Sequence, residues 1–235
     1  MKVVSLLSGG LDSTTVTAYA LSKHYDVFPL TFLYGQRHKK ELDSAKKVAD
    51  FYKLPLKIIK LDLRAIGGSA LTSNIPVPQQ RDIDDMSNEI PVTYVPARNT
   101  IFLSYALGFA EVINAKKIFI GANAIDYSGY PDCRPEYFRE FNKLANLATK
   151  TGVEGSKIKI EAPLLNMSKA EIIKLGTKLK VPYNLTWSCY EGKKKACGKC
   201  DSCLLRLKGF MEAGKQDPID YAYYPDFYIK YVRQK

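Results

Sequence analysis

The chain has 235 residues, 46% of them hydrophobic and 25% charged, which suits a globular domain with or without an appendage and excludes a largely disordered chain. No apolar run approaches the ~20 residues of a membrane span, and Met1 and Lys2 lead directly into a candidate strand, so we expect a cytoplasmic protein without a signal peptide or a membrane partner. The net charge of +11 would suit a nucleic-acid partner, but the densest lysine run covers only residues 193–195, so we expect solvated lysines and no stable nucleic-acid complex.

The N-terminal part of the chain alternates between candidate strands and candidate helices. Continuous apolar runs predict buried strands at 3–7, 26–34 and 56–61. Apolar residues that recur every three or four positions predict helices between them, at 12–23 and around 42–52. Parallel pairing with right-handed crossovers is the default arrangement of such a chain.

Residues 62–97 show no clear period and are punctuated by glycine and proline, so we expect a lid, a binding loop or a surface insertion there. Asn99 is expected to cap the helix that follows. An apolar stripe runs from Phe102 to Ile113, and because nearly every face of this helix is apolar we expect it in the interior.

Two more strands are predicted further along the chain, at 117–122 and 157–162. Pro135 suits the first position of a helix that runs to about Lys150. A capping box, Ser168-Lys169-Ala170-Glu171, opens another helix.

The five predicted strands and the helices between them indicate an α/β fold, with a Rossmann-like, doubly wound, five-stranded parallel sheet. We expect a nucleotide-binding domain over residues 1–183 and a helical, zinc-binding C-terminal subdomain over residues 184–235. In open parallel sheets, ligands bind at the carboxyl ends of the strands, near the point where the strand order reverses.

Ser8-Gly9-Gly10-Leu11-Asp12-Ser13 follows the first predicted strand and opens the first predicted helix. Such a turn collects free backbone N–H groups and a helix N-terminus, which favour a phosphate. Asp12 would repel phosphate, so we expect it to hold Mg²⁺ or to cap the helix. The turn is not a Walker P-loop, because no Gly-Lys-Ser/Thr follows it. A plain strand-to-helix turn is the alternative.

Four of the five cysteines, Cys189, Cys197, Cys200 and Cys203, fall within fifteen positions. Four thiolates close a tetrahedral Zn²⁺ site, and closely spaced pairs bring the sulfur atoms to one point. We therefore expect one structural zinc ion, with an iron–sulfur cluster and a redox pair as alternatives. Cys133 stands apart, as a small buried hydrophobe or as a residue of a pocket.

A polar loop at 123–135 follows the fourth predicted strand, at the same sheet edge as the glycine turn. Its carboxylates, tyrosines and arginine could stack on a flat heterocycle and hydrogen-bond its edge, and a solvated turn is the alternative. His38, in the loop after the second strand, could face ATP or lie at the surface. The loop residues concerned are Asp126, Tyr127, Tyr130, Asp132 and Arg134.

Five segments occur in the order that is typical of one known family. Together they resemble the 7-cyano-7-deazaguanine synthases, which belong to the PP-loop ATP pyrophosphatases and have an adenine nucleotide alpha hydrolase-like fold. The glycine turn is shared across that superfamily, whereas the loop and cysteine motifs are more specific. The segments are Ser8–Ser13, Tyr94–Asn99, Asp126–Pro135, Trp187–Tyr190 and Cys197–Cys203.

This resemblance implies an ATP-dependent ligase. Its substrate would be 7-carboxy-7-deazaguanine, whose carboxylate is adenylated, converted to an amide with ammonia, and then dehydrated to a nitrile after a second activation. The product would feed queuosine or archaeosine biosynthesis. The resemblance also implies Mg²⁺, one zinc ion on the four cysteines, and a homodimer.

We assign candidate roles on this basis. Arg98 is expected to hold the substrate carboxylate or an ATP phosphate, and the tyrosines and carboxylates of the 123–135 loop are expected to contact the heterocycle. The candidate catalytic residues are Ser8, Asp12, Ser13 and Arg98. The candidate ATP-binding residues are Leu7, Ser8, Gly9, Gly10, Leu11, Asp12, Ser13, Thr14 and His38. The candidate substrate-binding residues are Arg98, Asp126, Tyr127, Tyr130, Asp132 and Arg134.

Two other functions compete with this one. Another PP-loop enzyme, such as a tRNA thiolase or a tRNA-lysidine synthase, would act on a base within tRNA and bind tRNA with a steep salt dependence. A non-catalytic zinc protein that senses AMP or ATP would release no pyrophosphate in response to a carboxylate.

Overall fold

One parallel sheet organises the molecule, which we describe from a computed structural model that covers residues 1–82, 86, 90–124 and 130–234. The described residues form five strands in the order β3-β2-β1-β4-β5. The order reverses between β1 and β4, so the carboxyl ends of these two strands frame the switch point. The strands are β1 (Lys2–Leu6), β2 (Asp26–Leu33), β3 (Lys57–Lys60), β4 (Lys117–Phe119) and β5 (Lys159–Glu161).

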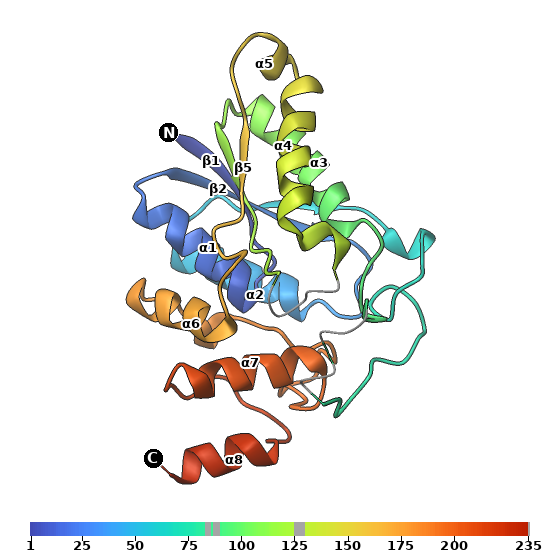
Figure 1. Cartoon of the computed structure of the whole chain (residues 1–235), viewed down its shortest axis with the longest axis vertical. Coiled ribbons are helices and arrows are strands. Elements are labelled where there is room, and N and C mark those ends of the chain that lie inside the picture. The colour runs from blue at the N-terminus through green and yellow to red at the C-terminus, as the bar shows by residue number, and fades with distance from the viewer. Residues whose placement is uncertain (83–85, 87–89, 125–129, 235) are drawn as a thin grey trace.

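Helices cover both faces of the sheet, as the doubly wound prediction required (Figure 1). Helices α1 (Leu11–Ser22) and α2 (Lys40–Phe51) lie on one face, and α3 (Arg98–Val112) and α4 (Pro135–Leu147) lie on the other. Short 3₁₀ turns occur at Leu63–Ala65, Pro131–Cys133 and Tyr183–Leu185. The remaining helices are α5 (Lys150–Val153), α6 (Lys169–Lys178), α7 (Asp201–Glu212) and α8 (Asp226–Arg233).

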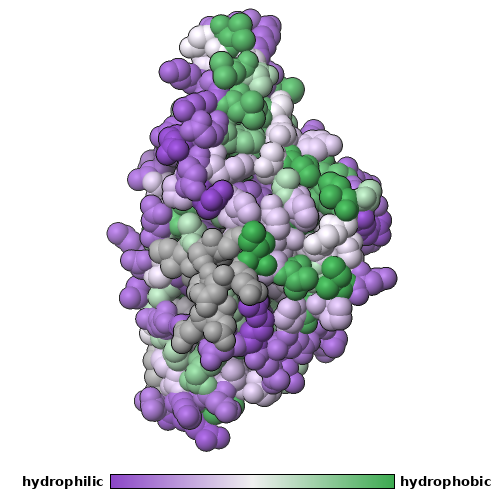
Figure 2. All heavy atoms as spheres, turned by 45° about the vertical axis from the view of Figure 1, so that its right-hand side comes forward, coloured by the Kyte–Doolittle hydropathy of each residue, from purple (hydrophilic) through white to green (hydrophobic). Residues whose placement is uncertain are grey.

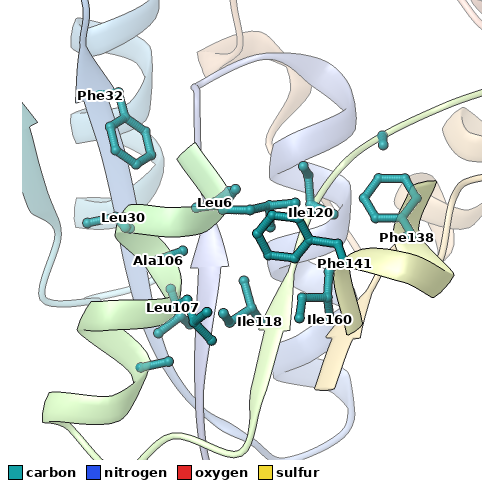
Figure 3. Packing of buried hydrophobic residues seen from close by; sticks show 14 of the residues in the cluster. Leu6, Leu30, Phe32, Ala106, Leu107, Ile118, Ile120, Phe138, Phe141 and Ile160 are labelled. Atoms are coloured by element: carbon teal, nitrogen blue, oxygen red, sulfur yellow. The ribbon is translucent and has the colours of Figure 1, made fainter. Parts of the chain in front are cut away.

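The core explains why the strands read as continuous apolar runs. Val3 packs toward α1, whereas its neighbour Val4 packs on the opposite face, so both faces of β1 are buried. On the second face, apolar side chains of four strands meet the apolar sides of α3 and α4 (Figure 3). Figure 3 labels Leu6, Leu30, Phe32, Ala106, Leu107, Ile118, Ile120, Phe138, Phe141 and Ile160 in this cluster.

The position of α3 differs from the prediction of an interior helix. Its buried side includes Leu103 and Ala110, while Tyr105 is 48% exposed and Val112 is 79% exposed. The helix covers one face of the sheet, so its other side meets solvent despite its apolar sequence. The predicted cap is also wrong: the helix begins at Arg98, one residue before Asn99.

The C-terminal helices form a layer of their own, in which α6, α7 and α8 follow one another below α1 (Figure 1). The capping box at the start of α6 is confirmed, because Ser168 Oγ accepts from the Glu171 N–H and the Glu171 carboxylate accepts from the Ser168 N–H. In the described part of the chain no helix has both the length and the apolarity to cross a bilayer. Figure 2 shows a face of mixed character, with hydrophilic side chains along both edges and over the lower part, and hydrophobic groups at the top and over the right-hand half.

Candidate active site and cysteine cluster

The glycine turn joins β1 to α1 and is held by its own two serines. Ser8 Oγ lies 3.0 Å from Ser13 Oγ, and the Ser8 N–H donates to Ser13 Oγ at 3.2 Å. Gly9 has a φ of +86°, and a Cβ there would lie 2.3 Å from the carbonyl oxygen of Glu41. Only glycine combines this backbone conformation with so close an approach of α2, so the turn can pack directly against that helix.

A cavity of about 230 Å³ opens above this turn, at the switch point between β1 and β4. Its walls come from the turn, the carboxyl ends of β2 and β4, the start of α3, and the segment between residues 187 and 206. Among the candidate ATP-binding residues, Gly9, Thr14 and His38 do not line it. The predicted residues that do are Leu7, Ser8, Gly10, Leu11, Asp12, Ser13, Arg98 and Tyr130.

Asp12 forms an ion pair at the edge of the cavity. Lys169 Nζ lies 2.8 Å and 2.9 Å from the two carboxylate oxygens of Asp12. Gly10 is the N-cap of α1 and no side chain caps the helix, so the capping role considered for Asp12 is wrong. Lys169 therefore brings positive charge to the side of the turn where the sequence suggested a metal ion.

Arg98 lies at the start of α3 and lines the cavity, as its place in the sequence predicted. Burial opposes its charge, but Tyr34, Tyr130 and Asp132 stabilise the guanidinium and raise the pKa of Arg98. Burial also raises the pKa of Tyr34 to about 12 and that of Cys133 to about 12. Arg98 is thus a permanent cation that lines the cavity, which suits the binding of an anion.

The 123–135 loop only partly matches its predicted role. Asp132 is 5% exposed and its Oδ2 accepts the backbone N–H of Asn99 at 2.9 Å, so this carboxylate serves the start of α3 and does not line the cavity. Arg134 is exposed and pairs with Glu136, away from the cavity. Tyr130 does line it, and the hydroxyl groups of Tyr130 and Thr93 lie 3.2 Å apart. The candidates Asp126 and Tyr127 lie outside the described residues.

The four clustered cysteines form a set of thiols that fits a tetrahedral metal ion. Their sulfur atoms all lie within 4.8 Å of one another, and the Sγ atoms of Cys197 and Cys203 are 3.8 Å apart. Tetrahedral zinc with Zn–S bonds of about 2.3 Å requires sulfur atoms roughly 3.8 Å apart. Backbone N–H groups of the cluster donate to the sulfur atoms of Cys189 and Cys197, as expected for thiolate acceptors. None of the cysteines forms a disulfide.

His38 lies against the cysteine loop and not in the large cavity. Its Nε2 is 3.0 Å from the carbonyl oxygen of Cys189, and a Cβ on Gly192 would lie 2.2 Å from its ring. Burial lowers the pKa of His38. The position predicted for an ATP contact is thus taken up in joining the loop after β2 to the cysteine cluster.

The cysteine region also contacts the glycine turn directly. The backbone N–H of Trp187 donates to the carbonyl oxygen of Gly9 at 2.9 Å, and the Trp187 ring N–H donates to the carbonyl oxygen of Cys189. Arg206 of α7 donates to Thr186 Oγ1 and pairs with Asp217 at 2.7 Å, which anchors this segment from below. Two hydrogen bonds therefore connect the first cysteine to the glycine turn.

Sequence reasoning missed several residues that line the cavity. Lys169 was visible only as part of a capping box, and Arg206 and Tyr34 carried no motif. Glu41 lines the cavity from α2, and burial raises its pKa from 4.5 to about 7. Glu41 lies only a few residues after the carboxyl end of β2, which places it near the ligand-binding edge of the sheet. Nothing in the sequence distinguishes it, however, from the acidic residues on the solvent side of α2.

Comparison with known proteins gives a family match over nearly the whole chain. The model of the family described as "Queuosine biosynthesis protein QueC" matches residues 2–214. A 7-cyano-7-deazaguanine synthase of Picrophilus torridus is 66% identical over 234 residues, covering 100% of this chain and 97% of that protein. A 7-cyano-7-deazaguanine synthase of Thermoplasma volcanium is 61% identical over 229 residues, covering 97% of this chain and 94% of that protein. Among solved structures, NMN synthetase from Francisella tularensis has a TM-score of 0.48 and 16% identity, covering 99% of this chain and 82% of that one.

Proposed function

Because this chain belongs to the queuosine biosynthesis protein QueC family, we infer that it is a 7-cyano-7-deazaguanine synthase, an ATP-dependent ligase that forms a carbon–nitrogen bond. It converts the carboxylate of 7-carboxy-7-deazaguanine to a nitrile. The observation that carries this proposal is the cavity at the switch point, which is lined by both the glycine turn and the cation Arg98.

The first chemical step activates the carboxylate. One carboxylate oxygen attacks the α-phosphorus of ATP, pyrophosphate leaves, and an acyl adenylate remains. We propose that Ser8, Ser13 and the N–H groups at the start of α1 hold the departing pyrophosphate. Lys169 adds positive charge beside them, and Arg98 orients the carboxylate. Mg²⁺ on Asp12 stays a prediction of the sequence.

The second and third steps build the nitrile. Ammonia attacks the acyl carbon, the bond to AMP breaks, and the amide forms with loss of one proton. A second ATP then adenylates the amide oxygen as pyrophosphate and one N–H proton leave, and departure of AMP with the second N–H proton gives the nitrile. The same cavity serves both activations, because each of them turns an oxygen atom into an AMP leaving group.

We propose that the deazaguanine ring binds beside Tyr130. Asp126 and Tyr127 of the same loop would complete its binding site. Asp132 and Arg134 are assigned a supporting role, because their side chains serve the start of α3 and the surface.

We further propose that the four cysteines, Cys189, Cys197, Cys200 and Cys203, hold one structural zinc ion, whose charge would fix the loop that carries Trp187. We also propose that the protein is a cytoplasmic homodimer and that its nucleotide-binding domain ends at residue 183. Size-exclusion chromatography with light scattering would test the dimer.

A single assay separates this function from its competitors. The protein is incubated with ATP, Mg²⁺, ammonium and 7-carboxy-7-deazaguanine, and the nitrile is sought by mass spectrometry while pyrophosphate is measured. Nitrile formation with carboxylate-dependent pyrophosphate release supports the synthase. Pyrophosphate release that requires tRNA would indicate a tRNA-modifying enzyme, and no release at all would indicate a nucleotide sensor.

A further inference from the structure

The proposed reaction poses a problem of proton transfer. At neutral pH ammonia is almost entirely ammonium, because the pKa of an ammonium group lies well above 7. Ammonium has four N–H donors and no lone pair, so it cannot attack an acyl adenylate. A site for this nucleophile must therefore offer acceptors, remove one proton and open toward the activated carbon.

A small chamber beside the main cavity has the size for this task. It has a volume of about 10 Å³, which is close to the space that one water molecule needs. A pyrrolopyrimidine ring is far too large for it, whereas ammonium has nearly the size of water. Five residues line both the chamber and the main cavity, so the two spaces adjoin: Tyr34, Gln36, Glu41, Leu71 and Tyr190.

Two unpartnered acceptors face this space from different segments. Within the described residues, no hydrogen bond or ion pair reaches the carboxylate of Glu41. His38 also lines the chamber, and its Nδ1 is buried without a hydrogen-bond partner. Since His38 Nε2 must donate to the carbonyl oxygen of Cys189, Nδ1 carries the lone pair of the neutral ring. A carboxylate and an imidazole lone pair together match a small cation with several N–H groups.

Within the described residues no cation forms an ion pair with Glu41, so its carboxylate can accept one. Arg37 lines the chamber, but its guanidinium donates to the carbonyl oxygens of Ala70 and Ile75. The positive charge of Arg98 on α3 acts on Glu41 without an ion pair and lowers its pKa, while burial, the larger effect, raises that pKa to about 7. The phenol of Tyr34 stays neutral at pH 7, because burial raises its pKa to about 12, and Lys40 and Glu191, which have opposite charges, both act on His38. A base is most effective when its pKa lies near the working pH.

We propose that the chamber between His38 and Glu41 binds ammonium and that Glu41 accepts one of its protons, releasing ammonia into the main cavity. This inference rests on the proposed function. The N–H bond electrons stay on nitrogen and become the lone pair that attacks the acyl carbon. The nitrogen–carbon bond forms, the carbon–oxygen bond to AMP breaks, and a second proton leaves the new amide nitrogen for solvent.

The test uses the full-length protein and separates this role from adenylation. Glu41→Gln keeps the size of the side chain but removes the base, and Asp43→Asn makes the same charge change on the exposed side of the same helix. We expect Glu41→Gln to raise the KM for ammonium or lower kcat by at least tenfold, and Asp43→Asn to change neither. ATP–pyrophosphate exchange that depends on 7-carboxy-7-deazaguanine, measured without ammonium, still occurs in Glu41→Gln.

A second nucleophile sharpens the result. Hydroxylamine is largely unprotonated at neutral pH and needs no base, so hydroxamate formation by Glu41→Gln should stay within about twofold of the wild-type rate. An equal loss with both nucleophiles, an unchanged ammonium dependence, or a raised KM for the heterocycle alone would each overturn the assignment. Failure of the proposed function is a different result, namely no carboxylate-dependent exchange by the wild-type protein.

Discussion

Lys169 Nζ contacts both carboxylate oxygens of Asp12, at 2.8 and 2.9 Å, although 157 residues separate them in the chain. The pair connects the start of α6 to the first turn of α1. Its side chains are 9% and 22% exposed, so water screens it only weakly.

We expect Lys169→Ala to weaken both stability and adenylation. The substitution leaves Asp12 without its partner beside the proposed phosphate site, which should cost roughly 1–3 kcal/mol of unfolding free energy. The added negative charge should lower kcat/KM for ATP by at least tenfold. Urea unfolding and ATP–pyrophosphate exchange measure the two effects. Lys174→Ala, on the exposed side of the same helix, is the matched control and should change neither quantity.

Gly9→Ala should destabilise the fold severely. A Cβ at this position would lie 2.3 Å from the Glu41 carbonyl oxygen and 2.5 Å from the Ala45 nitrogen, and the φ of +86° is strained for alanine. We expect a loss of roughly 3 kcal/mol or more. Gly108→Ala is the control, because a Cβ in that exposed position of α3 meets nothing within 4 Å. It should raise the stability by about 0.5–1 kcal/mol. Equal thermal shifts for the two variants would contradict the steric explanation.

Loss of the proposed zinc ion should weaken ATP binding. Cys197→Ser removes one of four thiolates, so we expect less than one zinc per chain by elemental analysis, a lower Tm and weakened ATP binding. The weakened binding follows from the hydrogen bonds that join Cys189 through Trp187 to Gly9. Cys133→Ser serves as the control and should retain one zinc. If the wild-type protein instead contains iron and labile sulfide, the four cysteines hold an iron–sulfur cluster and not zinc.

Glu41 should give the stability a pH dependence of its own. Its pKa rises from 4.5 to about 7 on folding, so the folded state binds the proton more tightly than the unfolded state. The free energy of unfolding should therefore fall as the pH rises from about 4.5 to about 7, by roughly 2–3 kcal/mol at most. Urea unfolding at pH 5 and pH 8 measures this slope. Glu41→Gln should remove the part of the slope that Glu41 contributes, and an identical slope in both proteins would refute the raised pKa of this carboxyl group.

Arg206→Ala should be among the most destabilising substitutions in the C-terminal region. Arg206 is 2% exposed and pairs with Asp217, whose side chain is 1% exposed. Removing the cation leaves a buried, uncompensated carboxylate, at a cost of roughly 3–5 kcal/mol. The exposed Arg233→Ala in α8 should change the stability by less than about 0.5 kcal/mol. Chemical denaturation distinguishes the two.

The sequence predicted the features whose signals are local. The glycine turn, the parallel strands and the capping box at Ser168 each lie within a few residues and follow from backbone geometry. The four cysteines were also recognisable, because close spacing and thiol chemistry together suffice for a metal site. Their meeting at one point needed no knowledge of the rest of the chain.

Features that depend on distant contacts could not be predicted. Nothing near Lys169 in the sequence points to Asp12, and nothing near Asp132 points to the first turn of α3. Nearly every face of α3 is apolar, which predicts an interior helix, yet Val112 is 79% exposed. Burial of a helix depends on what packs against it, which hydrophobicity alone does not specify.

The approach of Gly9 to Glu41 has a consequence for protein engineering and for evolution. The Glu41 carbonyl oxygen lies close against Gly9 of the glycine turn, while the side chain of the same residue lines the small chamber. The turn and helix α2 must therefore be transplanted together. A graft that moved Ser8–Ser13 alone into another scaffold would lose the spacing between the site of activation and the source of the nucleophile. We expect substitutions at Gly9 and Glu41 to be coupled in evolution.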